Sequence, residues 1–282
     1  MPAALLPIIA VIASAIFVVI SKTFFRRYGR LTSREFVWLQ FVGIVGVLWL
    51  AAPFFTQLPT RELLVSSSVM MLGIVALAVV GNLLYYWGLE HEKISEIEPF
   101  LLFTPLVTIL IASAFYANER IWPVYVTAVI ASIVLGWAHL KRKHLAFRLG
   151  LVVILVYALV NGFEVVITRH LLDIYNPFTL YLLRSTGILV LLSLVAAPKF
   201  GWLKLHHFAM MGILGALAVG SVVATYAAFQ LRGVSETIFV FTLGPVLVYL
   251  LSVVFLQERW QRKNIIASVI ILALVAWVSL LK

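Results

Sequence analysis

Residues 95–120, SEIEPFLLFTPLVTILIASAFYANER, are repeated in outline by residues 235–259, SETIFVFTLGPVLVYLLSVVFLQER. In each stretch a Ser-Glu pair opens an apolar run, a proline follows nine residues after the glutamate, and a Glu-Arg pair ends the run. A tyrosine, Tyr86 or Tyr226, stands nine residues before each serine. An ordinary apolar helix has no reason to repeat these features in the same order. The chain therefore contains two copies of one unit.

The composition is that of a membrane protein. Hydrophobic residues make up 63% of the 282 positions and charged residues only 11%, and the mean hydropathy is +1.11. A soluble domain carries about 25% charged residues. There are no cysteines, which excludes a disulfide framework and thiolate metal sites. The net charge of +10 lies in short loops between apolar runs, which indicates membrane topology and contact with the lipid bilayer rather than nucleic-acid binding.

Ten apolar runs are long enough to cross a bilayer, which takes about 20 residues. We expect them all to be helices, because lipid offers no hydrogen-bonding partner to an open strand edge. The loops between them are too short for a soluble domain. The runs are Ala3–Ser21, Glu35–Phe55, Leu64–Leu89, Ser95–Tyr116, Ile121–Leu140, Leu149–Ile167, Pro177–Ala197, Phe208–Leu231, Ser235–Leu256 and Asn264–Leu281.

Each copy of the unit holds five of these runs. The first repeat covers residues 1–140, a basic linker covers 141–148, and the second repeat covers 149–282. Because five is odd, the second repeat starts on the opposite side of the membrane and is inverted. We therefore expect an all-α membrane protein of ten transmembrane helices, arranged as two inverted five-helix repeats around a central cavity.

The basic residues predict an orientation. Fifteen Lys and Arg residues fall in the odd-numbered loops, and five fall in the even-numbered loops and at the C-terminus. The positive-inside rule then places the odd loops in the cytoplasm and both termini on the periplasmic side of a bacterial inner membrane.

The ten helices, the duplication and the repeated pattern at Ser95–Arg120 and Ser235–Arg259 resemble the EamA-type branch of the drug/metabolite transporter superfamily. The resemblance covers nearly the whole chain. It implies a basket of helices around a central cavity and transport of amino acids, other small metabolites or organic cations. Arg184 matches the arginine that the family carries in the second helix of a half. The first half offers only Gln40 there and departs from the pattern.

A proline stands near the middle of the fourth run of each half. Pro105 and Pro245 each remove a backbone hydrogen bond and bend the helix, and Thr104 and Gly244 precede them. The bend is either a structural kink or a hinge that lines the pore. Its occurrence in both halves favours the hinge.

Glu164 and Arg184 are the charges that lie well inside the apolar runs. Glu164 precedes Arg169 by five residues, and Arg184 follows Pro177 by seven, so both lie about 8–10 Å below the same membrane surface. A charge at the bilayer centre costs about 2.5–3.5 kcal/mol on insertion scales. We expect an ion pair that faces the bundle interior and either binds substrate or is purely structural. Proton coupling through Glu164 stays open.

Other polar and aromatic side chains are candidates for the cavity wall. Aromatic faces suit an amino-acid side chain or an organic cation, although Tyr and Trp also gather at membrane interfaces. Glycines are expected where helices pack closely. The cavity candidates are Asn82, Tyr85, Tyr86, Asn161, Tyr226 and Gln230, and the glycines are Gly73, Gly81, Gly88, Gly212, Gly215 and Gly220.

The sequence contains no motif for catalysis or for ATP hydrolysis: it has no P-loop, GxGxxG, nucleophile elbow or HExxH. We predict no enzyme activity, no cofactor and no metal site. The segment Glu90–Lys93 is interpreted as a solvated loop. Glu119-Arg120 and Glu258-Arg259 are expected to tie loops to helix ends.

Together these features predict a secondary transporter that exports a small organic metabolite, with an amino-acid-like compound as the expected substrate, as a monomer or homodimer. The alternatives within transport are proton-coupled efflux of organic cations or drugs, nucleotide-sugar transport, and uptake. A lipid translocator and a non-transporting membrane scaffold are alternatives of another class.

Overall fold

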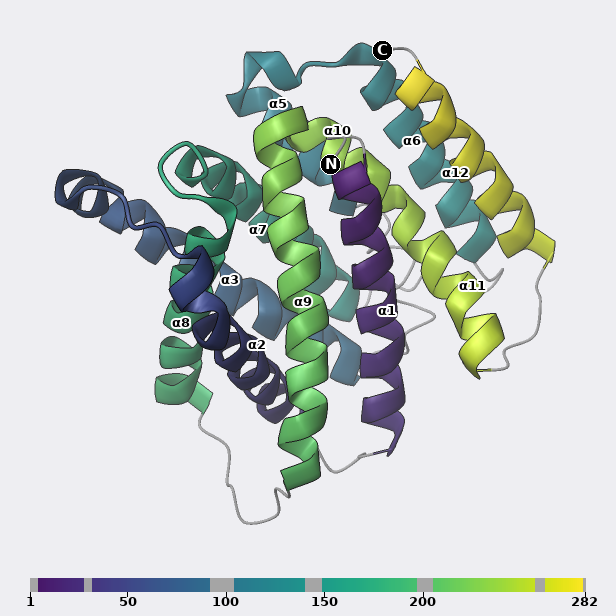
Figure 1. Ribbon diagram of the computed structural model, residues 1–282. Coiled ribbons are helices and arrows are strands. Elements are labelled where there is room, and N and C mark those ends of the chain that lie inside the picture. Colours follow the sequence, from purple (N-terminus) through teal and green to yellow (C-terminus); the bar gives the residue numbers. More distant parts are fainter. Residues whose placement is uncertain are drawn as a thin grey trace.

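The structure is a computed structural model that describes residues 5–27, 32–91, 104–139, 149–196, 205–256 and 262–280. Within these residues every regular element is a helix (Figure 1). The first half holds α1 Leu5–Arg27, α2 Ser33–Phe55, α3 Arg61–His91, α5 Thr104–Phe115, η1 Ala117–Glu119 and α6 Trp122–His139. The second half holds α7 Leu149–Leu171, α8 Pro177–Ala196, α9 Leu205–Arg232, α10 Val234–Val240, η2 Phe241–Leu243, α11 Gly244–Leu256 and α12 Arg262–Leu280.

These helices coincide with the predicted apolar runs, and the differences lie at their ends. The first helix continues past Ser21 to Arg27, and the sixth continues past Ile167 to Leu171. The fourth predicted run is described only from Thr104 onward, so Ser95 and Glu96 lie outside the described residues.

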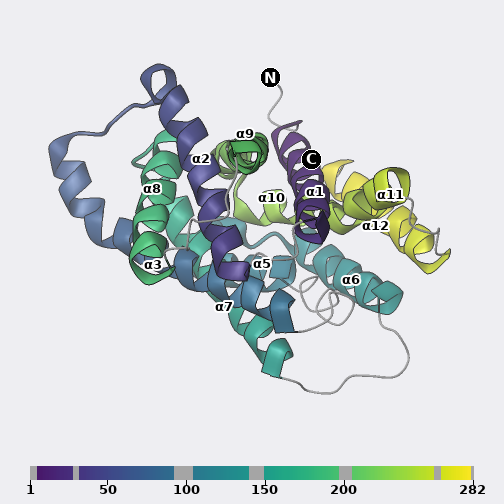
Figure 2. The same cartoon turned by 90° about the horizontal axis from the view of Figure 1, so that it is seen from below.

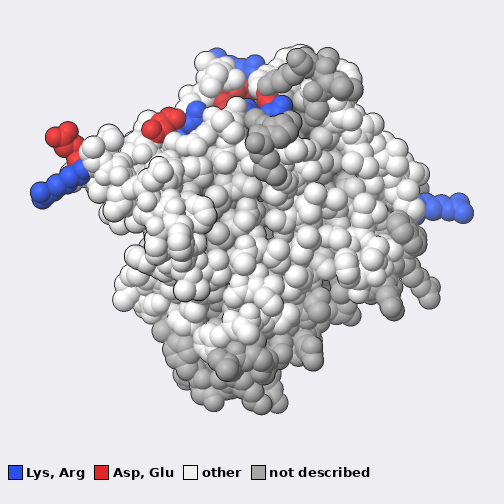
Figure 3. All heavy atoms as spheres, in the orientation of Figure 1, with Lys and Arg blue, Asp and Glu red and all other residues white. Residues whose placement is uncertain are grey.

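Hydrophobic surface marks the protein as an integral membrane protein. Figure 3 shows charged side chains along the upper edge and at the outer left and right, with a broad uncharged middle. Within the described residues, five helices are long and apolar enough to cross a membrane, and shorter apolar helices accompany them. The five are Arg34–Phe55, Arg61–Tyr85, Pro177–Val195, Phe208–Arg232 and Val234–Phe255.

The helices pack mainly across the boundary between the two halves. α1 and α2 pack against α9, α3 and α5 pack against α7, and α2 also contacts α8. Figure 2 shows α6, α11 and α12 on one side of the molecule and α2, α3 and α8 on the other, with α9 between them. The largest core cluster joins α2, α3, α8 and α9, and a second joins α1, α5 and α6 to α10, α11 and α12.

The proline in the ninth predicted run lies just after a tightened turn of that helix. α10 ends at Val240, the turn tightens to a 3-10 segment over Phe241–Leu243, and α11 starts at Gly244 with Pro245 as its second residue. The first turn of a helix suits proline, because its N–H groups lack partners within the helix. The residues before Thr104 lie outside the described part of the chain, so a bend at Pro105 stays a prediction. The helix tightens before Pro245 while Val240, Phe241 and Gly244 keep helical backbone angles, and the hinge at Thr104, Pro105, Gly244 and Pro245 stays a prediction.

Two glycines let α2 and α9 touch through their backbones. A Cβ on Gly215 would lie 2.5 Å from the carbonyl carbon and oxygen of Gly43, and a Cβ on Gly43 would overlap the carbonyl oxygen of Met211. Close packing is therefore confirmed at Gly215 and occurs also at Gly43. It was wrongly expected at Gly73, Gly212 and Gly220, where a Cβ meets nothing within 4 Å.

This crossing gives a stability prediction. Gly43→Ala and Gly215→Ala should each lower the free energy of unfolding by about 1–3 kcal/mol, because the added methyl group meets backbone that cannot move aside. Gly46→Ala and Gly212→Ala are matched controls on the same two helices, since a Cβ there meets nothing within 4 Å. Thermal unfolding in detergent measures the difference. Equal midpoints in all four variants would contradict the backbone contact.

Candidate functional site

An ion pair between α7 and α8 forms the centre of the candidate site. A guanidinium nitrogen of Arg184, Nη2, donates to Oε1 of Glu164. The two side chains are only 12% and 11% exposed. This contact confirms the ion pair predicted from the sequence. The prediction succeeded because Glu164 and Arg184 lie at similar distances from the short turn that joins their helices. Its role in binding substrate stays a prediction.

Local sequence fixes how α8 begins and hence where Arg184 lies. The side-chain carbonyl of Asn176 accepts from the backbone N–H of Thr179 at 2.7 Å, and Pro177 is the first residue of the helix. Asn caps a helix N-terminus well, and Pro suits its first position. The amide of Asn176 also donates to the Phe55 carbonyl at 3.2 Å, which ties this turn to the end of α2. Arg184 then follows two turns into α8.

Tyrosines surround the pair. Tyr181, three residues before Arg184, meets Tyr226 of α9 edge to face with ring centroids 6.0 Å apart. Tyr157, seven residues before Glu164, lies 5.3 Å from the Tyr85 ring of α3. Side chains three or seven positions apart lie on one face of a helix. The site therefore draws on α3, α7, α8 and α9, which come from both halves of the chain.

Burial makes the electrostatics of this cluster strong. The charges of Glu164 and Arg184 both act on the hydroxyl groups of Tyr181 and Tyr226. Charges interact more strongly here than in water, because the surroundings have a low dielectric constant. Within the described part of the chain, the buried Nε of Arg184 has no hydrogen-bond partner. The guanidinium thus keeps one donor that Glu164 does not use.

The structure places some of the predicted cavity residues near the ion pair and others away from it. Tyr226 contacts Tyr181, one turn from Arg184, whereas Tyr85 contacts Tyr157, two turns from Glu164. Asn161 is partly exposed on α7, one turn before Glu164. The amide of Asn82 donates to the Ala78 carbonyl of its own helix at 2.7 Å. The side chain of Tyr86 lies outside the described residues. Sequence reasoning missed Tyr157 and Tyr181, although their spacing from Glu164 and Arg184 was a usable signal.

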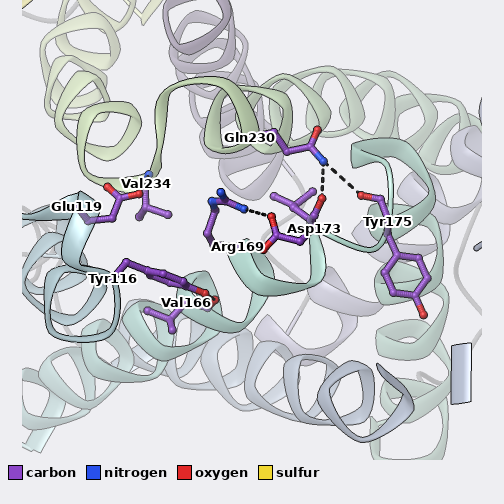
Figure 4. A network of polar contacts seen from close by, with 9 residues as sticks. Tyr116, Glu119, Val166, Arg169, Asp173, Tyr175, Gln230 and Val234 are labelled. Atoms are coloured by element: carbon purple, nitrogen blue, oxygen red, sulfur yellow. Dashed lines mark hydrogen bonds and ion pairs between the residues drawn. The ribbon is translucent and has the colours of Figure 1, made fainter. Parts of the chain in front are cut away.

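Gln230 belongs to a polar network at the end of the bundle (Figure 4). Its amide donates to the carbonyls of Leu172 at 2.6 Å and Tyr175 at 3.4 Å, so it holds the turn between α7 and α8. Arg169 pairs with Asp173 at 2.6 Å on the same turn. Gln230 therefore binds the α7–α8 turn to the C-terminal end of α9, whereas the Arg169–Asp173 pair lies within the turn.

Tyr116 and Glu119 hold the other side of this network. The Tyr116 hydroxyl donates to the Val166 carbonyl at 3.1 Å. Glu119 accepts from the backbone of α10, and Nε of Arg120 donates to the Ser113 carbonyl at 3.0 Å. The predicted tie between loop and helix ends is confirmed for Glu119-Arg120. Glu258 and Arg259 lie outside the described residues.

The ion pair gives a second stability prediction. Arg184→Ala leaves the carboxylate of Glu164 buried without its partner and should cost about 3–5 kcal/mol of unfolding free energy. Adding Glu164→Gln removes the uncompensated charge and should recover part of that loss. Unfolding of the single and double variants in detergent measures this coupling. Strictly additive losses would mean that the two side chains do not interact.

Comparison with known proteins supports a transporter. No curated protein matches the sequence significantly. One solved structure, described only as "Crystal structure of protein", aligns with a TM-score of 0.79 at 17% identity over 99% of this chain and 96% of its own. That likeness shows a shared fold. Residues 148–280 match the EamA-like transporter family. The matched residues form the second half of the chain, and the apolar helices show that the protein is an integral membrane protein.

Proposed function

We propose that this protein is a secondary transporter that moves a small organic metabolite by alternating access, with the Glu164–Arg184 pair at the substrate site. The buried pair is the observation that carries the proposal. A pair kept only for stability would be no better than a well-packed apolar replacement. Charged residues inside membrane proteins mark substrate and ion pathways.

The pattern of helix contacts supports two inverted five-helix halves, residues 1–140 and 149–282. In the two halves, α1 corresponds to α7 and α3 corresponds to α9. The contact between α1 and α9 therefore has an equivalent contact between α7 and α3, and both occur. The contact of α5 with α7 likewise becomes that of α11 with α1, and both occur. A pseudo-two-fold axis in the membrane plane predicts such exchanged pairs. Ten crossings, with both termini in the periplasm of a bacterial inner membrane, complete this proposal.

The chemistry of the site favours an amino-acid-like substrate. A molecule with a carboxylate and an ammonium group can replace both members of the ion pair at once: its carboxylate faces Arg184 and its ammonium faces Glu164. A ligand with one charge would leave the other protein charge buried without a partner, which is costly. The tyrosine faces favour the ammonium group through cation–π contact. Export is the proposed direction, and uptake is the alternative.

Proton-coupled efflux of an organic cation is the second candidate. Glu164 favours it, because a buried carboxylate can exchange a proton for a cation. In that case Arg184 would hold the carboxylate charged until the cation arrives. The two candidates differ in whether a substrate carboxylate is needed for transport.

Proteoliposome counterflow tests both candidates. Wild-type vesicles loaded with amino acids should take up labelled amino acid saturably, and amine analogues without the carboxylate should fail to compete. Glu164→Gln should slow this flux about tenfold or more, because one buried charge-assisted hydrogen bond contributes about 1.5–3 kcal/mol. Glu62→Gln removes an exposed carboxylate on α3 and is the matched control.

Each alternative gives a different result in the same vesicles. Competition by amines together with pH-driven uptake would favour cation efflux over amino-acid transport. Scrambling of labelled lipid would indicate a lipid translocator. The absence of any flux across a panel of metabolites, with folded protein in the vesicles, would contradict transport.

A further inference from the structure

Glu119 holds the beginning of α10 with both carboxylate oxygens. Oε1 accepts the backbone N–H of Val234 and Oε2 accepts that of Ser235, each at 2.7 Å. The hydroxyl of Ser235 donates in turn to the Glu119 backbone carbonyl at 3.1 Å. Glu119 is only 2% exposed. A buried carboxylate is thus fully engaged with the free N–H groups and the positive dipole end of a helix.

The chain around Gly233 is shaped to admit this carboxylate. Gly233 has φ of +84°, in the region that favours glycine. A Cβ at this position would lie 2.7 Å from Oε1 of Glu119. Gly233 therefore serves two purposes: it turns the chain from α9 into α10, and it leaves the space that the Glu119 side chain fills.

This contact joins the two halves rather than two neighbours in sequence. Glu119 follows α5 in the first half, whereas Val234 and Ser235 begin the ninth apolar run in the second half. In the sequence, Glu119 belongs to the Glu-Arg pair of one repeat and Ser235 to the Ser-Glu pair of the other. The end of the repeated stretch in the first half thus contacts the beginning of that stretch in the second half.

Other polar ties between the halves lie at the same end of the bundle, where the even-numbered loops gather. The backbone N–H of Gln57 donates to the Thr179 hydroxyl at 2.9 Å. The hydroxyls of Ser67 and Tyr175 are 2.7 Å apart and share a hydrogen bond. The hydrogen bonds of Glu119 add a charged group to these contacts between neutral groups. The partner of Glu119, α10, is followed by the 3-10 segment Phe241–Leu243, where the helix changes its hydrogen-bonding pattern before Pro245.

We propose that Glu119 is a clasp that keeps this end of the transporter closed, and that α10 moves away from η1 about the Phe241–Leu243 segment when the clasp opens. The inference rests on the proposed transport function for its purpose. The contact between the Glu119 carboxylate and α10 can be tested without knowing the substrate. A cap within one helix would stabilise that helix alone, whereas this one holds two halves together.

Thiol labelling tests the clasp directly, because the chain has no cysteine and a single introduced one is unique. Thr237→Cys places the reporter in the first turns of α10, at a fully buried position. In proteoliposomes without substrate, Glu119→Gln should speed labelling of this thiol by a hydrophilic maleimide about tenfold. The new side-chain amide can accept only one of the two backbone N–H groups of α10, because its second polar atom is an NH₂ group that faces a donor.

Two controls separate opening from unfolding. Asp173→Asn removes an exposed carboxylate at the same end and should leave labelling unchanged. A reporter at Ser132→Cys, buried in α6, should stay protected in the Glu119→Gln protein. Gly233→Ala should act like Glu119→Gln, because its methyl group displaces the carboxylate, and it replaces that variant if Glu119→Gln does not fold.

The outcomes are distinct. Faster labelling at Thr237→Cys alone supports the clasp, even if no substrate flux is ever found. Unchanged labelling in Glu119→Gln and Gly233→Ala would overturn it. Equal gains at Thr237→Cys and Ser132→Cys would also overturn it, because they would show general loss of structure.

Discussion

A charge buried in a membrane protein has to be compensated, and this requirement organises the centre of the molecule. Glu164 and Arg184 neutralise each other between α7 and α8. Their pairing fixes the facing surfaces of both helices, and the Asn176 cap fixes the start of α8. Tyrosines from α3 and α9 then close around the pair. An apolar core would not need this precision, because its contacts are not directional.

The two halves form one core together. α1 and α2 pack against α9, and α3 packs against α7, so the main helix contacts cross from one repeat to the other. The polar contacts follow the same rule: Tyr116 bonds to Val166, and Glu119 bonds to Val234 and Ser235. The boundary between the repeats therefore carries the most extensive helix packing, and the contact of Tyr85 with Tyr157 on α7 is part of it.

The fold was largely predictable because apolar runs in a membrane have few other options. The helix ranges and the Glu164–Arg184 pair followed from span lengths and one short turn. The site was predictable only in part. Tyr181 and Tyr157 were missed, because neither is charged, although both lie at helical spacing from a member of the ion pair. Gln230 was assigned to the cavity, but its amide bonds to backbone carbonyls of a turn that is distant in sequence. Such partners are set by tertiary packing.

The glycine crossing of α2 and α9 limits how the halves can move. At Gly43 and Gly215 backbone touches backbone, with no side chain between them to change rotamer. Sliding either helix along the other would drive neighbouring side chains into main-chain atoms. Rotation about the contact keeps the fit. If the two halves move during transport, the ends of the bundle would swing apart while the distance between α2 and α9 at this crossing stayed constant.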